Sequence, residues 1–207
     1  MWKNLLLDRQ GYLKITDFGF AKKVEFKTYT LCGTPEYIAP EVLLNKGHGK
    51  GVDWWTLGIL LYEMLCGEPP FVDDDPMGIY QKILSKKLSF PRNYDKNAKS
   101  LTKKLLAHDL TKRYGCLKGG AKDIRDSKFF NCIDWHKLLE RKLDSPIIPE
   151  ISGETDTSNF DFYPDSSEEA GTPMFENNDP FEFFWCDDVN YGAIFVSIRI
   201  LISKVKL

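Results

Sequence analysis

The sequence has few of the features that mark secreted, disulfide-bonded or membrane-spanning proteins. Its five cysteines show no Cys-x-x-Cys spacing, and no charged segment followed by an apolar one stands at its start. The apolar segment 192–203 is about 12 residues long and contains Arg199, whereas a membrane-spanning helix needs roughly 20 apolar residues. These absences predict free thiols in a reducing cytoplasm or nucleus, and we expect no membrane partner.

Basic residues are plentiful but are not gathered into a cluster. Residues 1–149 contain 25 Lys or Arg against 18 Asp or Glu, whereas residues 150–207 contain 3 against 12. In the positive part, acidic residues stand between the lysines, and no periodic basic stripe forms. We therefore expect no nucleic-acid partner, and the change of charge near residue 150 indicates two differently built parts.

Strand signals occur only near the start of the chain. Two apolar runs, Leu5–Leu7 and Tyr12–Thr16, flank the polar sequence Asp8-Arg9-Gln10-Gly11, which predicts a short β-hairpin. From residue 36 onward the periodicity is helical. The expected fold class is therefore mainly α (α+β), with the hairpin as its β component.

The most apolar helix is predicted to run from Asp53, a candidate N-cap, to Leu65, and to end before Gly67. Because nearly every side of this segment is apolar, the helix should lie in the centre of the domain, and Glu63 within it then needs a partner. A short helix should open at Pro40, and the remaining helices are expected at residues 77–87, 98–108, 120–129 and 135–143.

The composition changes after residue 145. Residues 150–185 contain ten acidic residues and no Lys or Arg, which is typical of an extended tail that wraps a surface. We therefore divide the chain into a helical domain (residues 1–145), a tail (residues 146–185) and an atypical apolar C-terminus (residues 186–207). The last segment is interpreted as an aberrant end from a misjudged gene boundary, with an apolar anchor as the alternative.

Short motifs in a fixed order give the clearest functional signal. Asp17-Phe18-Gly19 follows the predicted hairpin, and Ala39-Pro40-Glu41 comes 20 residues after Gly19. The sequence Val-Asp-Trp-Trp-Thr-Leu-Gly follows at residues 52–58. Chance does not assemble motifs of this length in this order.

With these motifs, the sequence closely resembles the AGC family of protein serine/threonine kinases, in particular the catalytic subunits of cyclic-AMP-dependent kinases. The resemblance extends from Asn4 to about Trp185, and residues 109–115 (DLTKRYG) and 156–160 (DTSNF) match that subfamily. It implies the large C-terminal lobe of a protein-kinase fold, with the small N-terminal lobe absent from this sequence.

The resemblance implies ATP and Mg²⁺ as cofactors. Asp17 matches the aspartate that binds Mg²⁺ through carboxylate oxygen, and Asn4 matches the asparagine that helps to hold a second Mg²⁺. Phe160 and Tyr163 match an aromatic pair that closes over the nucleotide. Thr34 matches a residue that supports catalysis.

The resemblance also implies regulation by phosphorylation. Thr30 matches the activation-loop phosphosite, which an activating kinase modifies, and Lys22 matches one cation that pairs with the phosphate. Thr172-Pro173 is a candidate turn phosphosite, with a plain linker as the alternative. The motif Phe181-Glu182-Phe183-Phe184 matches the FxxF motif that docks on an N-terminal lobe.

The resemblance also implies how the substrate is recognised, with a purely structural buried pair with Tyr37 as the alternative for Glu63. Glu36 and Glu63 match contacts for substrate arginines, with Tyr37 positioned to hydrogen-bond Glu63, so the expected substrates carry basic residues before the target Ser or Thr. A pocket for the hydrophobic side chain after the target residue matches Leu31, Cys32, Gly33 and Pro35.

Three further residues match structural positions of the family. Glu41 and Arg113 correspond to a buried ion pair, in which loss of one partner costs about 3–5 kcal/mol. Asp53 corresponds to an aspartate that reaches back to the backbone of the catalytic loop. Tyr29 and Tyr80 match contacts with a cyclic-AMP-binding regulatory subunit, and for Tyr80 a plain packing role is the alternative.

The catalytic aspartate of the kinase motif would precede Met1, and the loop lysine would fall on Met1 itself. The Gly-rich loop and the phosphate-gripping strand lysine are also absent from the 207 residues. We therefore expect negligible activity from this chain alone. The alternatives are a non-catalytic module that binds a regulatory subunit or a substrate, and a gene-model artefact with no role of its own.

Overall fold

The computed structural model describes residues 4–163, and the predicted features at Thr172, at Phe181–Phe184 and within residues 186–207 lie outside them. The chain begins with strands β1 (Leu5–Leu7) and β2 (Leu13–Ile15), which pair antiparallel with Leu5 opposite Ile15. The turn closes where the Gly11 N–H donates to the Asp8 carbonyl at 2.8 Å. The predicted hairpin is confirmed.

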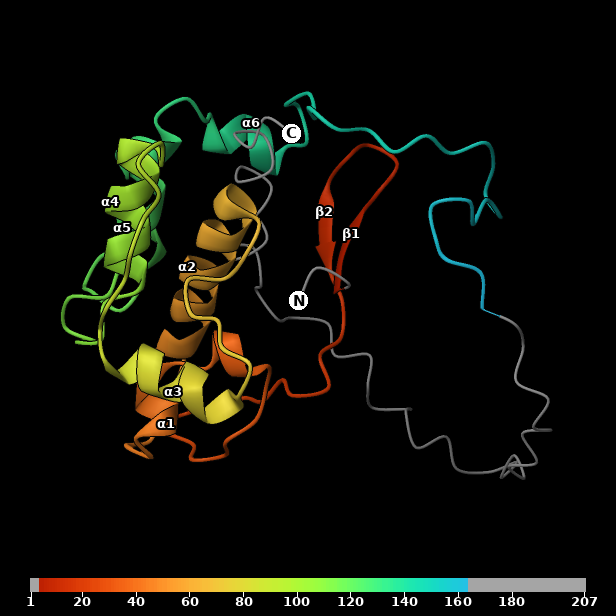
Figure 1. Ribbon diagram of the computed structural model, residues 1–207. Helices are drawn as coiled ribbons and strands as arrows, with labels where there is room; N and C mark the ends of the chain where they lie inside the picture. Colours follow the sequence, from red (N-terminus) through yellow and green to blue (C-terminus); the bar gives the residue numbers. More distant parts are fainter. Residues whose placement is uncertain (1–3, 164–207) are drawn as a thin grey trace.

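Helix α2 (Gly51–Cys66) is the long central helix, and Figure 1 shows it between the hairpin and helix α4 (Lys96–Leu105). It ends at Gly67, which adopts φ 86° and donates its N–H to the Glu63 carbonyl, as the sequence predicts. The predicted N-cap at Asp53 is wrong, because the helix begins two residues earlier at Gly51. No side chain caps this end, and the Val52 and Asp53 N–H groups donate instead to the Gly49 and Lys50 carbonyls, both at 3.2 Å.

Most of the remaining elements are shorter than predicted. They are the 3₁₀ turns η2 (Pro35–Tyr37) and η3 (Lys128–Phe130) and helices α1 (Pro40–Leu43), α3 (Pro76–Leu84), α5 (Ala121–Arg125) and α6 (Trp135–Leu139). The helix predicted at 120–129 is broken into α5 and η3. Phe129 and Phe130 of η3 are both buried. Helix α6 ends early because Arg141 adopts a left-handed φ of 58°.

Helix α4 begins at Lys96, two residues before the predicted start, because the Asp95 side chain accepts the Ala98 N–H at 2.8 Å. Its apolar face packs against α2. Trp55, Ile59 and Leu60 of α2 have no accessible surface, so the predicted burial of this helix is confirmed.

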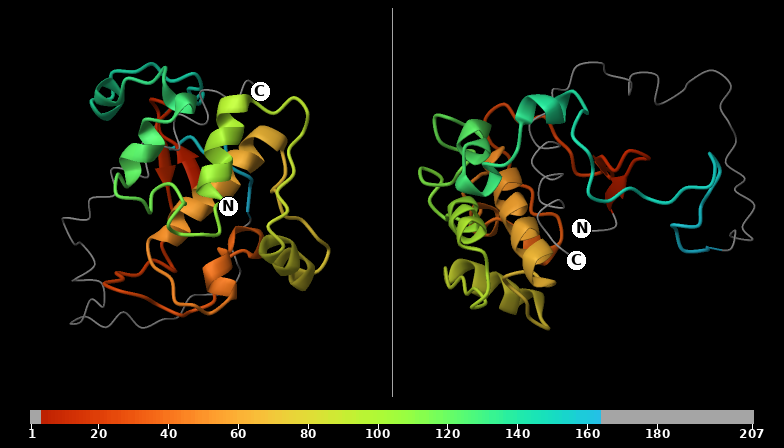
Figure 2. Two further views of the ribbon diagram at one scale, coloured as in Figure 1. Left: turned by 90° about the vertical axis from the view of Figure 1, so that its left-hand side faces the viewer. Right: turned by 90° about the horizontal axis from the view of Figure 1, so that it is seen from above.

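The two views of Figure 2 show the helices gathered around α2, with the hairpin on one side of it. The observed fold class is mainly α with one small antiparallel sheet, as predicted. Within residues 4–163, no helix is long and apolar enough to span a membrane. The four cysteines in this range, Cys32, Cys66, Cys116 and Cys132, are free thiols.

Candidate functional site

The hairpin brings the two predicted metal-binding residues together at its open end. Pairing of Leu5 with Ile15 places the chain entering β1 beside the chain leaving β2, and the Thr16 N–H donates to the Asn4 carbonyl at 3.0 Å. The Asn4 amide nitrogen donates to Asp17 Oδ2, also at 3.0 Å. Asp17 adopts a left-handed φ of 63°, and its other carboxylate oxygen accepts the Gly19 N–H at 3.3 Å.

The chemistry of this pair suits a hard divalent cation. Asp17 is exposed and Asn4 half-buried, and together they offer carboxylate and amide oxygens. Mg²⁺ usually takes one or two protein oxygens and fills its remaining positions with water and substrate phosphate. Among the described residues no group of three or more His, Cys, Asp or Glu side chains could enclose a metal alone. The pair therefore fits an ion that is shared with a phosphate ligand.

A buried tyrosine–glutamate pair lies where η2 meets α2. Tyr37 donates its hydroxyl to Glu63, and both residues are less than a tenth exposed. The contact agrees with the expected partner for Glu63. Burial, and then the hydrogen bond and the negative charge of Glu63, raise the pKa of Tyr37 far above its ordinary value. The hydroxyl therefore stays protonated as a donor to Glu63.

Glu36 stands next to this pair in the sequence and is half-buried. Its Oε2 atom is buried and accepts no hydrogen bond from the described residues. A buried carboxylate oxygen without a donor is costly. A guanidinium offers planar donors for such a group, so the environment of Glu36 is compatible with an arginine-containing ligand.

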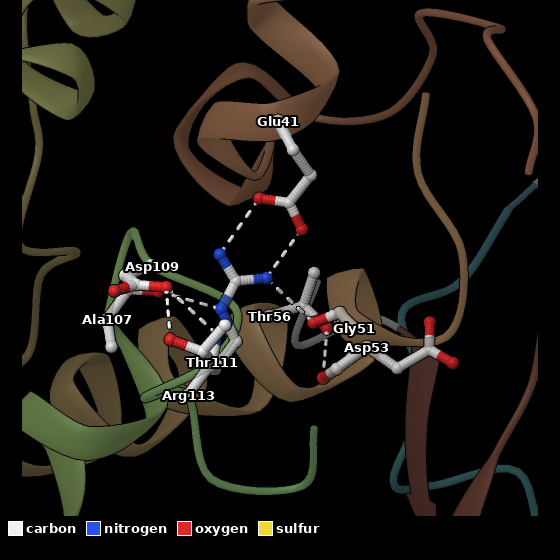
Figure 3. A network of polar contacts seen from close by, with 8 residues as sticks. All are labelled: Glu41, Gly51, Asp53, Thr56, Ala107, Asp109, Thr111 and Arg113. Carbon is white, nitrogen blue, oxygen red and sulfur yellow. Dashed lines mark hydrogen bonds and ion pairs between the residues drawn. The ribbon is translucent and has the colours of Figure 1, made fainter. Parts of the chain in front are cut away.

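Arg113 joins three parts of the domain, as Figure 3 shows. It binds Glu41 through two hydrogen bonds of 2.5 and 2.8 Å, so the predicted ion pair is present and bidentate. The same guanidinium donates to the carbonyl oxygens of Ala107 at 2.8 Å and Gly51 at 3.0 Å. These two backbone contacts could not be predicted, because a carbonyl acceptor carries no side-chain signature.

Asp53 takes no part in this network. In Figure 3 its carboxylate points away from Arg113, and its backbone carbonyl accepts the Thr56 hydroxyl at 2.9 Å. The residue keeps accessible surface, yet nearby protein atoms displace water from the carboxyl and raise its pKa. Among the described residues, no backbone N–H donates to the Asp53 carboxylate. The contact expected between Asp53 and the backbone of the catalytic loop therefore stays a prediction.

Comparison with protein families matches residues 2–130 to the protein kinase domain. The chain belongs to the protein kinase family. It is 55% identical to the human cAMP-dependent protein kinase catalytic subunit PRKX over 172 residues, which are 83% of this chain and 48% of that protein. It is 50% identical to the cAMP-dependent protein kinase catalytic subunit of Dictyostelium discoideum over 185 residues, 89% of this chain and 28% of that protein. The chain thus spans about half the length, or less, of these curated relatives.

Residues 20–34, which contain the predicted phosphosite Thr30, form a mostly exposed segment. It is attached to the loop after α1 by paired backbone hydrogen bonds of 2.9 Å between Thr28 and His48. Lys22 donates to the Thr28 hydroxyl at 3.3 Å rather than to Thr30, which is exposed. Thr28 and Thr30 are two positions apart in the sequence. Lys22, which contacts Thr28, therefore lies near the residue that is predicted to carry the phosphate. The role of Thr28 in this attachment was not predicted.

The residues predicted for the hydrophobic side of the substrate are mostly exposed. Leu31 is 57% exposed, Cys32 is a free exposed thiol, and Gly33 has a left-handed φ of 114° with open space around it. Thr34 precedes η2 and accepts the Tyr37 N–H through its carbonyl at 3.0 Å, and Pro35 opens the turn. Residues 31–34 directly precede Pro35 and Glu36 in the sequence, so the residues predicted for the hydrophobic side of the substrate adjoin a predicted arginine contact.

The two tail aromatics that are predicted to close over a nucleotide are exposed. Phe160 and Tyr163 are 62% and 77% exposed. The turn before them is fixed by Asp156, which accepts hydrogen bonds from the Ser152 and Ser158 backbone N–H groups, and these bonds lower the pKa of its carboxyl. Their closure over a nucleotide stays a prediction.

The two predicted regulatory-subunit contacts differ in exposure. Tyr29 is 61% exposed, and its ring lies so near Gly47 that a side chain there would overlap it. Tyr80 is half-buried on α3, which packs against η2 and α1. Both the binding role and the packing role of Tyr80 are compatible with this position.

Proposed function

We propose that this protein acts in phosphoryl transfer from ATP to Ser or Thr in proteins that carry basic residues before the target. Residues 4–163 then supply the substrate-docking surface and the metal-binding pair of the kinase. Membership of the protein kinase family and the similarity to cAMP-dependent catalytic subunits support this proposal. The observation that carries it is the Asn4–Asp17 pair at the open end of the hairpin.

Each group has a defined task in this proposal. Asp17 and Asn4 would hold Mg²⁺, which would supply positive charge to neutralise phosphate oxygens. Tyr37 fixes the Glu63 carboxylate so that its position is set before a substrate arrives. Glu36 and Glu63 then bind arginines of the substrate, and Thr30 is the site at which an activating kinase adds phosphate.

We further propose that a polypeptide of these 207 residues alone has negligible phosphotransferase activity. Phosphoryl transfer depends mostly on positioning and charge stabilisation. The sequence contains neither the Gly-rich loop nor the strand lysine that grip the phosphates. Incubation with Mg-ATP and an Arg-Arg-x-Ser peptide checks this, and appreciable turnover would contradict it.

Peptide binding tests the substrate site separately from turnover. A fluorescent Arg-Arg-x-Ser peptide should bind the chain, and Glu63→Gln should weaken binding by about tenfold or more, because a charge-assisted bond is replaced by a neutral one. Gln can still accept the Tyr37 hydroxyl, so the local geometry is kept. Glu140→Gln, in an exposed ion pair with Lys142, is the matched control. Equal affinities for all three chains would overturn the assignment of Glu63.

A second candidate function is a non-catalytic module that binds a cAMP-binding regulatory subunit. The exposed ring of Tyr29 on the activation segment favours it. Pull-down with a purified regulatory subunit, comparing the chain with its Tyr29→Ala variant, tests this function. Capture that does not depend on Tyr29 would argue against this surface.

A further inference from the structure

The turn of the hairpin is held by a segment that lies about 130 residues later in the chain. Arg141 forms an ion pair with Asp8, and its guanidinium carbon lies 4.2 Å from the centre of the Tyr12 ring. Both contacts come from one side chain. We call residues 141–147 the latch segment, and Figure 1 shows the chain after α6 passing beside the hairpin turn.

A second contact lies at Gly11. The Ser145 hydroxyl oxygen is 3.1 Å from the Gly11 carbonyl and 2.8 Å from the Ile147 carbonyl, and its single proton can serve either. Gly11 is buried although it belongs to a turn. A methyl group on Gly11 would overlap the Ile147 carbonyl and the Ser145 side chain. The latch segment therefore packs directly against the turn backbone.

Asp8 links the latch segment to the internal structure of the turn. Its Oδ1 atom accepts the backbone N–H groups of Gln10 at 3.0 Å and Tyr12 at 2.7 Å, while Oδ2 takes the Arg141 guanidinium. Burial opposes the charge of Asp8, but these backbone bonds and Arg141 outweigh it, and the pKa of the carboxyl is lowered. The carboxylate thus orders the turn and anchors it at the same time.

The opposite end of the same hairpin carries the metal pair. Each strand has three residues, so the turn and the pair are separated by about 10 Å of paired backbone, at roughly 3.3 Å per residue. A two-stranded hairpin is marginally stable by itself. Leu13 of β2 is buried in the core, and Leu5, Leu7 and Ile15 pack against it. Arg141 adds a charged contact at the tip, where these apolar side chains do not reach.

We propose that Arg141 is a positioning residue that, through Asp8, holds the hairpin so that Asn4 stays beside Asp17 for metal binding. Arg141 touches neither residue of the pair and acts only through the turn. The metal-binding half of this inference rests on the proposed function, whereas the effect on the hairpin does not.

Amide hydrogen exchange and Mn²⁺ titration of the full 207-residue chain, followed by NMR, test the inference. The Thr16 N–H reports on the pair because it donates to the Asn4 carbonyl. In Arg141→Ala, Thr16 should exchange about tenfold faster, because a local opening becomes easier while global stability stays. Mn²⁺ should also broaden the Gly19 amide signal at a several-fold higher concentration than in the unchanged chain. Arg141→Lys should restore part of both effects.

Two further variants keep the test decisive. Asp8→Asn retains acceptors for the turn but removes the charge that Arg141 meets, so it should reproduce the effects of Arg141→Ala to a smaller degree. Lys142→Ala removes only the exposed ion pair with Glu140 and should behave as the unchanged chain. Ala adds no backbone strain at position 141, because Arg141 already has a positive φ.

The possible outcomes separate the two proposals. Thr16 exchange that is unchanged in Arg141→Ala and in Asp8→Asn would overturn the positioning role. The positioning role would also be overturned if, in Arg141→Ala, the exchange rates of the Thr16 N–H and of the Gly67 N–H at the end of α2 rose equally. Such a result would mean that the whole domain is destabilised. If the unchanged chain binds no Mn²⁺, the metal role in the proposed function fails, while Thr16 exchange still decides the role of Arg141.

Discussion

Arg113 and Glu41 lie 72 positions apart in the sequence and form a bidentate ion pair inside the domain. Arg113 has no accessible surface and Glu41 keeps only 7%. The guanidinium also stacks near the Trp55 ring, at 5.2 Å from its centre. With its donations to Gly51 and Ala107, Arg113 joins α1, which contains Glu41, to the start of α2 and to the loop after α4.

Replacement of Arg113 by Met should lower the free energy of unfolding by about 3–5 kcal/mol, because Glu41 would remain buried without a counter-charge. Urea denaturation followed by tryptophan fluorescence measures the change. Lys112→Met is the matched control, since Lys112 pairs with Asp109 at the surface and such pairs contribute about 0–1 kcal/mol. A loss for Arg113→Met that is as small as the control loss would refute the buried pair.

Stability should fall at alkaline pH because two buried tyrosines, Tyr37 and Tyr62, and the half-buried Tyr94 are held as neutral groups. Desolvation is the main cause that raises the pKa of Tyr37, Tyr62 and Tyr94, for Tyr62 to about 12. Below the ordinary value near 10, the folded and unfolded states are equally protonated at these sites. Above it the unfolded state releases protons first, so stability is lost as the pH rises toward the folded pKa values.

Urea denaturation at pH 8, 9.5 and 11 measures this loss. The Tyr94→Phe variant should lose less stability between pH 9.5 and 11, although it starts lower because the contact with the Thr102 hydroxyl at 3.1 Å is gone. Identical slopes for the variant and the unchanged chain would show that Tyr94 does not contribute to the alkaline transition.

The sequence predicted the features that depend on local patterns. The hairpin, the burial of α2 and its end at Gly67 follow from apolar runs and a C-terminal glycine, and the structure confirms all three. The start of α2 could not be predicted in this way. The helix begins without a side-chain cap, and the Val52 and Asp53 N–H groups donate to the backbone carbonyls of Gly49 and Lys50, so no residue type marks its first position.

Similar limits apply to the candidate site. Glu41 with Arg113 and Tyr37 with Glu63 could be paired from the motifs, and both contacts are present. The attachment of Lys22 to Thr28 and the contact of Arg141 with Asp8 were not foreseen. Both depend on how loops lie over one another, and a lysine or arginine in a loop carries no periodic signal that would indicate its partner.

Removal of either member of the metal pair should weaken divalent-cation binding. Asn4→Ala deletes the amide that contacts Asp17, and loss of such a supporting group typically costs about 10–100-fold in metal affinity. Asp17→Asn, which removes the only charge of the pair, should cost at least as much. Electron paramagnetic resonance of free Mn²⁺ during titration measures the affinity.

The control for the metal prediction is Asp144→Asn, an exposed carboxylate on the latch segment. It removes the same charge from the chain without touching the pair. Equal Mn²⁺ affinities for Asp17→Asn and Asp144→Asn would mean that the ion senses only the net charge of the protein, and the site would then have to lie elsewhere.

Two glycines with similar backbone angles allow backbone strain to be separated from packing at the hairpin turn. Gly11 has φ 75° and Gly67 has φ 86°, but open space surrounds Gly67, whereas a methyl group on Gly11 would overlap Ile147 and Ser145. Gly67→Ala should cost about 1–2 kcal/mol from the left-handed conformation alone. Gly11→Ala should cost about 1–3 kcal/mol more, because overpacking adds to the same strain. Thermal unfolding of both variants checks the difference, and equal losses would show that the latch segment moves away from the turn without cost.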